Sequence, residues 1–196
     1  MKSKKFPFIL LIALLLISTI GINVFAVIST KNLACPNVKQ EKSNWCWAGS
    51  SLSILNHFYM YTDQQTFVTY VQTGKTAPIN ASNIGATDAD VLKGLNYFGA
   101  SGSIFSGALS FSSVQNQLLY NYPIWTHISW LDSTDKITGG HAVVIDKYYS
   151  DSIAGDQEIT YMDPWDGAHY TMSYSSFVYT AHDQKWTSGI SNITKK

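Results

Sequence analysis

The stretch from Gln40 to Tyr59 reads QEKSNWCWAGSSLSILNHFY and places one cysteine at the beginning of a segment with helical periodicity. Four apolar residues recur there at the i, i+4, i+7 spacing that gives a helix one buried face. They are Ala48, Leu52, Leu55 and Tyr59. Ser43 or Asn44 is suited to cap the N-terminus. We therefore expect a helix that runs from Cys46 to about Tyr61, with the cysteine in its first turn.

The position of Cys46 favours a reactive thiol. At the first turn of a helix, unpaired N–H groups and the positive end of the helix dipole favour the thiolate over the thiol. A free cysteine is more often an ordinary packing residue, so the neighbours matter. Trp45 and Trp47 bracket the thiol, and Gln40 precedes it by six residues. Because a side-chain amide can donate to a developing oxyanion, we interpret Cys46 as a candidate nucleophile and Gln40 as a candidate oxyanion donor.

Two later segments carry candidate partners for this cysteine. His141 stands in GGHAVVI, residues 139–145, where two glycines would let a substrate approach the backbone closely. Asp163 opens the triplet Asp-Pro-Trp at the end of the next apolar segment. Each has an ordinary alternative, because a histidine on a strand is often a hydrogen-bonded core residue and Asp-Pro is a common turn initiator.

Taken together, Gln40 with Cys46-Trp47, Gly140-His141-Ala142-Val143 and Asp163-Pro164-Trp165 resemble the three active-site segments of papain-like cysteine peptidases. The resemblance implies that Cys46 is the nucleophile, His141 the general base and Gln40 the oxyanion donor. Asp163, in place of the usual Asn, would orient His141. Trp165 would cover that hydrogen bond from water, and Trp47, Gly140 and Trp165 would contact substrate. Trp130, Tyr97 and Phe98 are further aromatic residues that could line the groove.

The spacing indicates which branch the chain resembles. His141 follows Cys46 by fewer residues than the roughly 130 to 150 usual for papain itself. The closer resemblance is to compact bacterial members, such as bacteriocin-leader peptidases and secreted effector proteases of plant pathogens.

Helices are expected in the first part of the chain and strands in the second. Further helices are predicted over residues 62–76, 87–99 and 114–122, the second opened by a capping box of Thr87 and Asp90 and the third capped by Ser112 or Ser113. Strands are predicted over residues 124–130, 141–148, 159–162 and 170–173, with a hairpin turn at Asp166-Gly167. This order predicts an α+β fold. The resemblance implies a nucleophile helix and a helical subdomain packed on an antiparallel sheet that forms an incomplete barrel.

The N-terminal segment predicts export. Lys2, Lys4 and Lys5 precede an apolar run from Phe6 to about Ile28, and small residues offer a cleavage site after Ala26. We expect a signal peptide over residues 1–26, a connector over 27–39 and one peptidase domain over 40–196. An uncleaved membrane anchor is the alternative, since the run is long enough to cross a bilayer. Either way the domain would lie outside the cytoplasmic membrane, secreted or anchored at its outer face.

Composition narrows the class of partner. The chain has 196 residues and no net charge, which argues against nucleic acid as a partner. No histidine pair or cysteine pair has the spacing of zinc ligands, so we expect no metal and no cofactor. We expect a monomer that acts on peptides or proteins. The second cysteine, Cys35, is expected to be either inert or available to a partner, and a disulfide between Cys35 and Cys46 would silence the enzyme.

The remaining histidines compete less well for the role of base. His57 would lie three turns from Cys46 on the same helix, His127 is expected to be structural and His182 to lie in an irregular tail. His169 is the best substitute.

Two other functions use the same residues. One is a cell-wall amidase or endopeptidase, or an acyl transferase, with the same triad. The other is an inactive homologue that only binds peptides.

Overall fold

The computed structural model describes residues 26–77 and 81–196, so the expected signal segment lies, apart from Ala26, outside the described residues. The helices are α2 (Cys46–His57), α3 (Gln64–Thr73), α4 (Asp88–Tyr97), α5 (Phe111–Leu119) and α6 (Tyr174–Val178). The strands are β1 (Ile28–Asn32), β2 (Ala100–Ser106), β3 (Ile124–Leu131), β4 (Ile137–Asp151), β5 (Asp156–Asp163), β6 (Ala168–Ser173), β7 (Tyr179–Thr180) and β8 (Gln184–Lys195). Within these residues no helix is long and apolar enough to cross a membrane.

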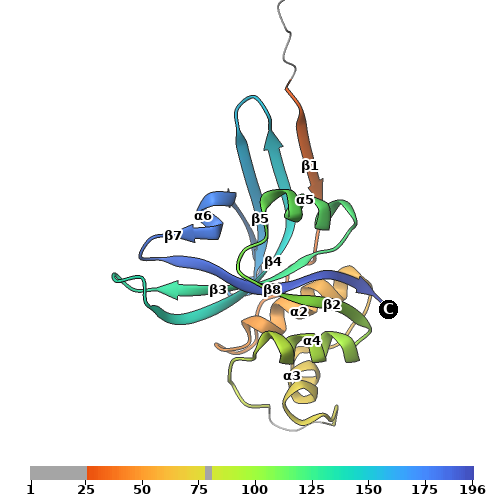
Figure 1. The fold of residues 1–196 in the computed structure, drawn as a ribbon. Helices are drawn as coiled ribbons and strands as arrows, with labels where there is room; N and C mark the ends of the chain where they lie inside the picture. Colours follow the sequence, from red (N-terminus) through yellow and green to blue (C-terminus); the bar gives the residue numbers. More distant parts are fainter. Residues whose placement is uncertain (1–25, 78–80) are drawn as a thin grey trace, which may run out of the picture.

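Helices α2, α3 and α4 gather below the antiparallel sheet (Figure 1), whereas α5 and α6 lie against its strands. The strand order is β2-β8-β3-β4-β5-β6, while β1 pairs with β4 and β7 with β8. In the part of the chain that the structure describes, the two ends of this order, β2 and β6, do not pair. The α+β prediction is confirmed, and the barrel is incomplete.

Helix α2 lies at the centre of the fold. Its residues from Trp47 to Leu55 are all buried. A helix that is buried all round must satisfy its polar side chains internally. Ser50 Oγ donates to the carbonyl of Ala142 on β4 at 2.9 Å, and Ser53 Oγ donates to the carbonyl of Pro36 at 2.7 Å. These bonds fix the helix against the sheet and the N-terminal segment.

Both ends of α2 differ in part from the prediction. The helix begins at Cys46 as expected but ends at His57, and Tyr59 is exposed with a positive φ of 61°, so it is not part of the buried face. The N-cap is Trp45, which makes no capping bond through its side chain. Ser43 and Asn44 do not cap because they bind Asn83 instead, through Ser43 Oγ at 2.9 Å and the Asn44 N–H at 2.9 Å.

The other predicted helices are present with small shifts. Thr87 caps α4, and Asp90 at N3 completes the predicted capping box. The cap of α5 is Ser110, not Ser112 or Ser113, because the Ser110 hydroxyl accepts from the Ser113 N–H. The helix therefore starts three residues earlier than predicted.

The four predicted strands are present, but the sheet is larger than the sequence indicated. Residues 28–32, expected as a connector, form β1 against β4. Strands β2 and β8 were also missed, and β8 is a central strand between β2 and β3. His182 accordingly lies in the turn before β8, not in an irregular tail. The pattern was weak because β8 carries serines and a glycine among its buried residues, Trp186, Ile190 and Ile193.

Candidate active site

The N-terminus of α2 and the turn after β5 are packed directly against each other. A Cβ added to Gly49 on α2 would lie 2.8 Å from Cβ of Pro164, so glycine permits this approach. The Gln40 N–H also donates to the Pro164 carbonyl at 2.7 Å. The segment that leads into Cys46 is thereby tied to the turn that begins at Asp163.

His141 on β4 is paired with that turn. Its Nε2 lies 2.7 Å from Oδ1 of Asp163, which also accepts the Trp165 N–H at 2.8 Å. His141 is 8% exposed. Because Nε2 is engaged by the carboxylate, Nδ1 is the ring nitrogen left for the thiol.

The surroundings of His141 favour the imidazolium. Burial alone would lower its pKa, but hydrogen bonds to Asp163 and Cys46 and the negative charges of both groups outweigh burial and raise the pKa from 6.5 to about 9. Cys46, His141 and Asp163 therefore interact as one unit in which the histidine holds a proton at neutral pH.

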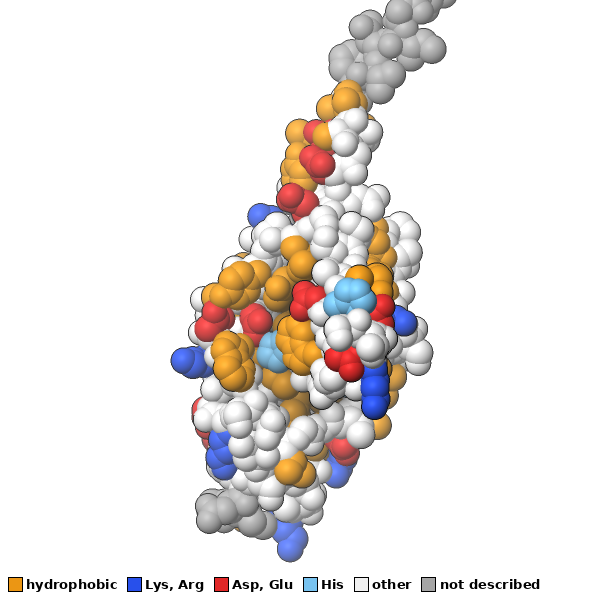
Figure 2. All heavy atoms as spheres, turned by 90° about the vertical axis from the view of Figure 1, so that its left-hand side faces the viewer, with side chains coloured by type: hydrophobic (Ala, Val, Ile, Leu, Met, Phe, Trp, Pro, Cys, Tyr) orange, Lys and Arg blue, Asp and Glu red, His pale blue; other side chains and the backbone are white. Residues whose placement is uncertain are grey.

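The three residues open onto one cleft of about 480 Å³. Its other lining residues are Ser43, Asn44, Gly85, Trp130, Gly140 and Trp165. Figure 2 faces the side of the molecule where β3 and β7 end, and it shows hydrophobic side chains, a histidine and acidic side chains gathered around a hollow. The cleft thus has two indole rings, of Trp130 and Trp165, in its lining together with the His141–Asp163 pair.

The Cys46 backbone N–H is available as a donor. In the described part of the chain it has no acceptor from the protein, whereas the N–H groups of Ala48 and Gly49 bond to the Trp45 carbonyl. An unpaired N–H at a helix N-terminus beside a nucleophile is suited to stabilise an oxyanion.

Cys46, His141 and Asp163 follow one another in the chain order of the segments that resemble papain-like peptidases, and the sequence comparison agrees. The model of the family described as "Papain-like cysteine protease AvrRpt2" matches residues 29–182. The chain belongs to this family of papain-like cysteine peptidases. The protein is therefore a hydrolase. A separate comparison with curated protein sequences found no significant match.

A solved peptidase structure shares this fold. The peptidase domain of Streptococcus ComA, a bifunctional ABC transporter involved in a quorum-sensing pathway, matches with a TM-score of 0.54 and 15% identity, covering 83% of this chain and 99% of that one. A double glycine motif protease from an AMS/PCAT transporter, solved in complex with the leader peptide, has a TM-score of 0.48 and 14% identity and covers 80% and 94%.

In this papain-like peptidase, Gln40 is buried and is not among the residues that line the cleft, and its amide is engaged. Nε2 donates to the carbonyl of Lys42 at 2.9 Å and to that of Ser43 at 2.8 Å. Its Oε1 is buried and has no partner among the described residues. Because an amide has two N–H groups, both donors of Gln40 are occupied by the loop that precedes Cys46.

The residues expected to contact substrate divide between two cavities. Gly140 and Trp165 line the cleft, whereas Trp47 is 2% exposed and lines an adjacent pocket. The ring that stacks on His141 is Trp130, at 5.9 Å between centroids and 19° between planes. Trp165 is 63% exposed and lines the cleft together with His141 and Asp163, so the expectation that it shields the His141–Asp163 bond stays a prediction.

Some lining residues had little signal in the sequence. Asn83 forms hydrogen bonds with Ser43 and Asn44, which join the loop before Cys46 to the loop that contains Gly85. Both loops therefore reach the cleft. Nothing in their spacing indicates this contact. Of the aromatic residues considered for the groove, Trp130 and Trp165 line it, whereas Tyr97 and Phe98 pack against Tyr70 and each other.

The substitute base and the second cysteine form a separate cluster. His169 Nε2 lies 3.0 Å from Oδ2 of the buried Asp146, which also accepts the Cys35 N–H at 2.9 Å. Burial raises the pKa of the Cys35 thiol, and the negative charge of Asp146 raises it further. Both cysteines are free thiols in the structure, and Cys35 does not line the cleft.

Proposed function

We propose that the chain is a secreted cysteine peptidase in which Cys46 is the nucleophile, His141 the general acid and base, and Asp163 the residue that orients His141. The observation that carries this proposal is the bond of 2.7 Å between His141 and Asp163 in the cleft that Cys46 lines. Export rests on the basic and apolar pattern of residues 2–28.

The proposed reaction begins with attack of the Cys46 thiolate on a peptide carbonyl carbon. The Cys46 N–H stabilises the oxyanion, and Gln40 adds a second donor when one of its two loop contacts opens. His141 then gives its proton to the leaving amine as the C–N bond breaks, which leaves a thioester. His141 takes a proton from water, the hydroxide displaces the thiolate, and a carboxylic acid is released.

Replacement of the nucleophile tests this proposal. We expect Cys46→Ala to reduce the cleavage of a mixed peptide library to background, and an epoxide inhibitor to label the parent protein at Cys46 only. The matched control is Cys35→Ala, which removes the other thiol, a residue that does not line the cleft, and should leave both cleavage and labelling in place. Cleavage by Cys46→Ala at the parental rate would falsify the assignment.

A further inference from the structure

A second, smaller cavity of about 200 Å³ adjoins the cleft, and we call it the side pocket. It shares Cys46, Gly85, Gly140 and His141 with the cleft. A group in this pocket would therefore sit beside the reacting atoms.

Most of the side pocket is apolar. Trp47 and Trp125 supply indole rings, and their N–H groups donate to the carbonyls of Ile84 at 3.0 Å and Trp47 at 3.4 Å. These indoles therefore offer only carbon surface to an occupant. The polar side chain of this lining, apart from the catalytic residues, is His127 on β3.

Asp88 fixes which nitrogen of His127 is free. Nδ1 of His127 lies 3.4 Å from Oδ1 of Asp88, the first residue of α4. Burial would raise the pKa of Asp88, but hydrogen bonds from His127 and Ser188 and the attraction of His127 outweigh it and lower the pKa, so this carboxylate stays ionised. An ionised carboxylate keeps the proton on Nδ1, which makes Nε2 the acceptor of the neutral ring.

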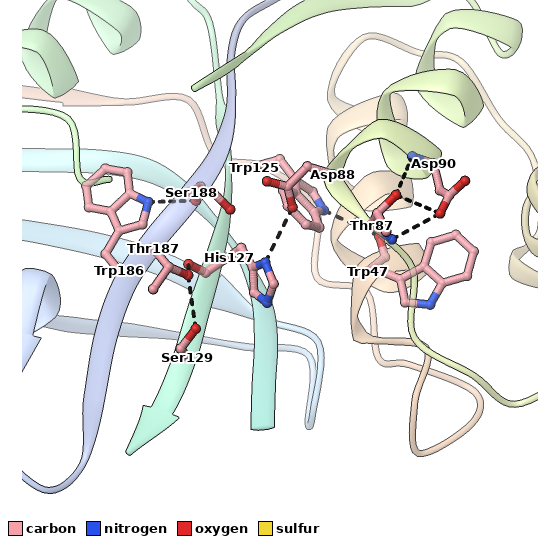
Figure 3. A network of polar contacts seen from close by, with 10 residues as sticks. All are labelled: Trp47, Thr87, Asp88, Asp90, Trp125, His127, Ser129, Trp186, Thr187 and Ser188. Atoms are coloured by element: carbon pink, nitrogen blue, oxygen red, sulfur yellow. Dashed lines mark hydrogen bonds and ion pairs between the residues drawn. The ribbon is translucent and has the colours of Figure 1, made fainter. Parts of the chain in front are cut away.

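The free nitrogen faces the catalytic strand. In Figure 3, His127 points one ring nitrogen at Asp88 and the other away from it. A Cβ added to Gly140 would lie 2.6 Å from Nε2, so the imidazole occupies the space that a side chain at position 140 would fill. The glycine before His141 thus admits a polar group next to the base.

We propose that the side pocket binds a substrate side chain whose hydroxyl donates a hydrogen bond to Nε2 of His127, and that His127 with Asp88 is a specificity determinant. This inference rests on the proposed function and names its substrate class: peptides with Thr or Tyr at the position that enters the side pocket. The apolar walls would contact the stem of the side chain. The acceptor nitrogen would distinguish Thr from Val and Tyr from Phe, pairs that differ little except in the hydroxyl.

Competition between peptides tests this inference. For a cleaved library peptide, each position near the scissile bond is varied as Thr, Val, Tyr and Phe, and the ratios of kcat/KM within each pair are measured. We expect the parent enzyme to prefer the hydroxyl member of a pair about fivefold at one position, the effect of one net hydrogen bond. In His127→Phe, which keeps a flat ring without an acceptor, the ratio should fall to about one.

Three further variants keep the result interpretable. Asp88→Asn leaves the imidazole in place but no longer fixes its tautomer, so the ratio should also fall. If His127→Phe does not fold, the ratio measured for Asp88→Asn decides the outcome. The control pair is His182 and Asp135, an exposed ion pair of 3.3 Å, for which His182→Phe and Asp135→Asn should keep the parental ratio. Ratios measured within one variant do not depend on its folded fraction.

The outcomes separate the two proposals. If the enzyme cleaves peptides but the kcat/KM ratio is the same in the parent, His127→Phe and Asp88→Asn, the role of His127 is overturned and the peptidase proposal stands. A parent enzyme that cleaves no peptide and is not labelled at Cys46 would overturn both.

Discussion

Asp163 raises the pKa of His141. Papain-like enzymes usually carry an Asn at this position, with a neutral side-chain amide. An amide could accept the same imidazole hydrogen but would bring no charge. The carboxylate, with the Cys46 thiolate on the other side, raises the pKa of His141 to about 9 despite burial. The imidazolium is therefore the dominant form at neutral pH. Turnover should fall as pH rises through about 9, where His141 loses the proton that, in the proposed mechanism, goes to the leaving amine.

The variant Asp163→Asn tests this effect. Removing the charge should lower the pKa of His141, so the alkaline loss of kcat/KM should move to lower pH by about 1 to 3 units. The measurement is the pH profile of peptide cleavage, with the parent enzyme as reference. An unchanged alkaline limb would mean that Asp163 does not set the proton affinity of His141.

Gln40 has two possible roles that a suitable pair of assays separates. As an oxyanion donor it would act only when a tetrahedral intermediate forms, whereas its bonds to Lys42 and Ser43 shape the loop at all times. Alkylation of Cys46 by an epoxide forms no such intermediate. We expect Gln40→Ala to lower kcat by about 10² to 10³ and to leave the alkylation rate near the parental value. Equal losses in both assays would show that Gln40 only shapes the loop.

At the scale of elements, the contact between α2 and the turn after β5 decides the geometry of the site. Gly49→Ala would place a Cβ 2.8 Å from Pro164, and neither the buried helix nor the proline ring can move easily. We expect a loss of about 1 to 3 kcal/mol in the free energy of unfolding, with a fall in kcat because Asp163 shifts with the turn.

The control for this prediction is Gly139→Ala on β4. A Cβ there would lie 3.5 Å from the Trp130 ring, an ordinary van der Waals contact. Urea unfolding and peptide turnover of both variants provide the comparison. A Gly49→Ala protein as stable and active as Gly139→Ala would show that the close approach does not constrain the site.

At the scale of the whole molecule, the strand β8 near the C-terminus connects β2 to the rest of the open sheet. Strand β8 lies between β2 and β3, and Trp186 on it is 1% exposed against Phe105 and Phe177. We expect Trp186→Ala to lower the free energy of unfolding by about 3 to 5 kcal/mol, since it leaves a large cavity in the core. Ile28→Ala on the edge strand β1, where the side chain is 61% exposed, should change it by less than about 0.5 kcal/mol. Equal values in urea unfolding would contradict the central position of β8.

The predictable part of the fold had strong local signals. Thr87 and Asp90 form a capping box through contacts three residues apart, and Asp166-Gly167 forms a turn because Gly167 adopts a positive φ of 79°. Strands β1, β2 and β8 lacked such signals. Their residues form strands because of partners far along the chain, as in Ile28 with Asp151 and Ala100 with Lys195.

The sequence by itself determined the chemistry of this protein: a cysteine at a helix N-terminus, a histidine before an apolar strand and an aspartate after the next one, in the order that papain-like peptidases use. These are choices of residue type and local position, which spacing and capping reveal. Only the tertiary structure decided that the Gln40 amide donates to carbonyls of its own loop. The same is true of the stacking of Trp130, and not Trp165, on His141. It is true also of Asp88, which fixes the imidazole of His127 beside Gly140. Each of these depends on which side chains meet after α2, α4 and the sheet have packed, and a pairing between distant residues leaves no periodic trace along the chain.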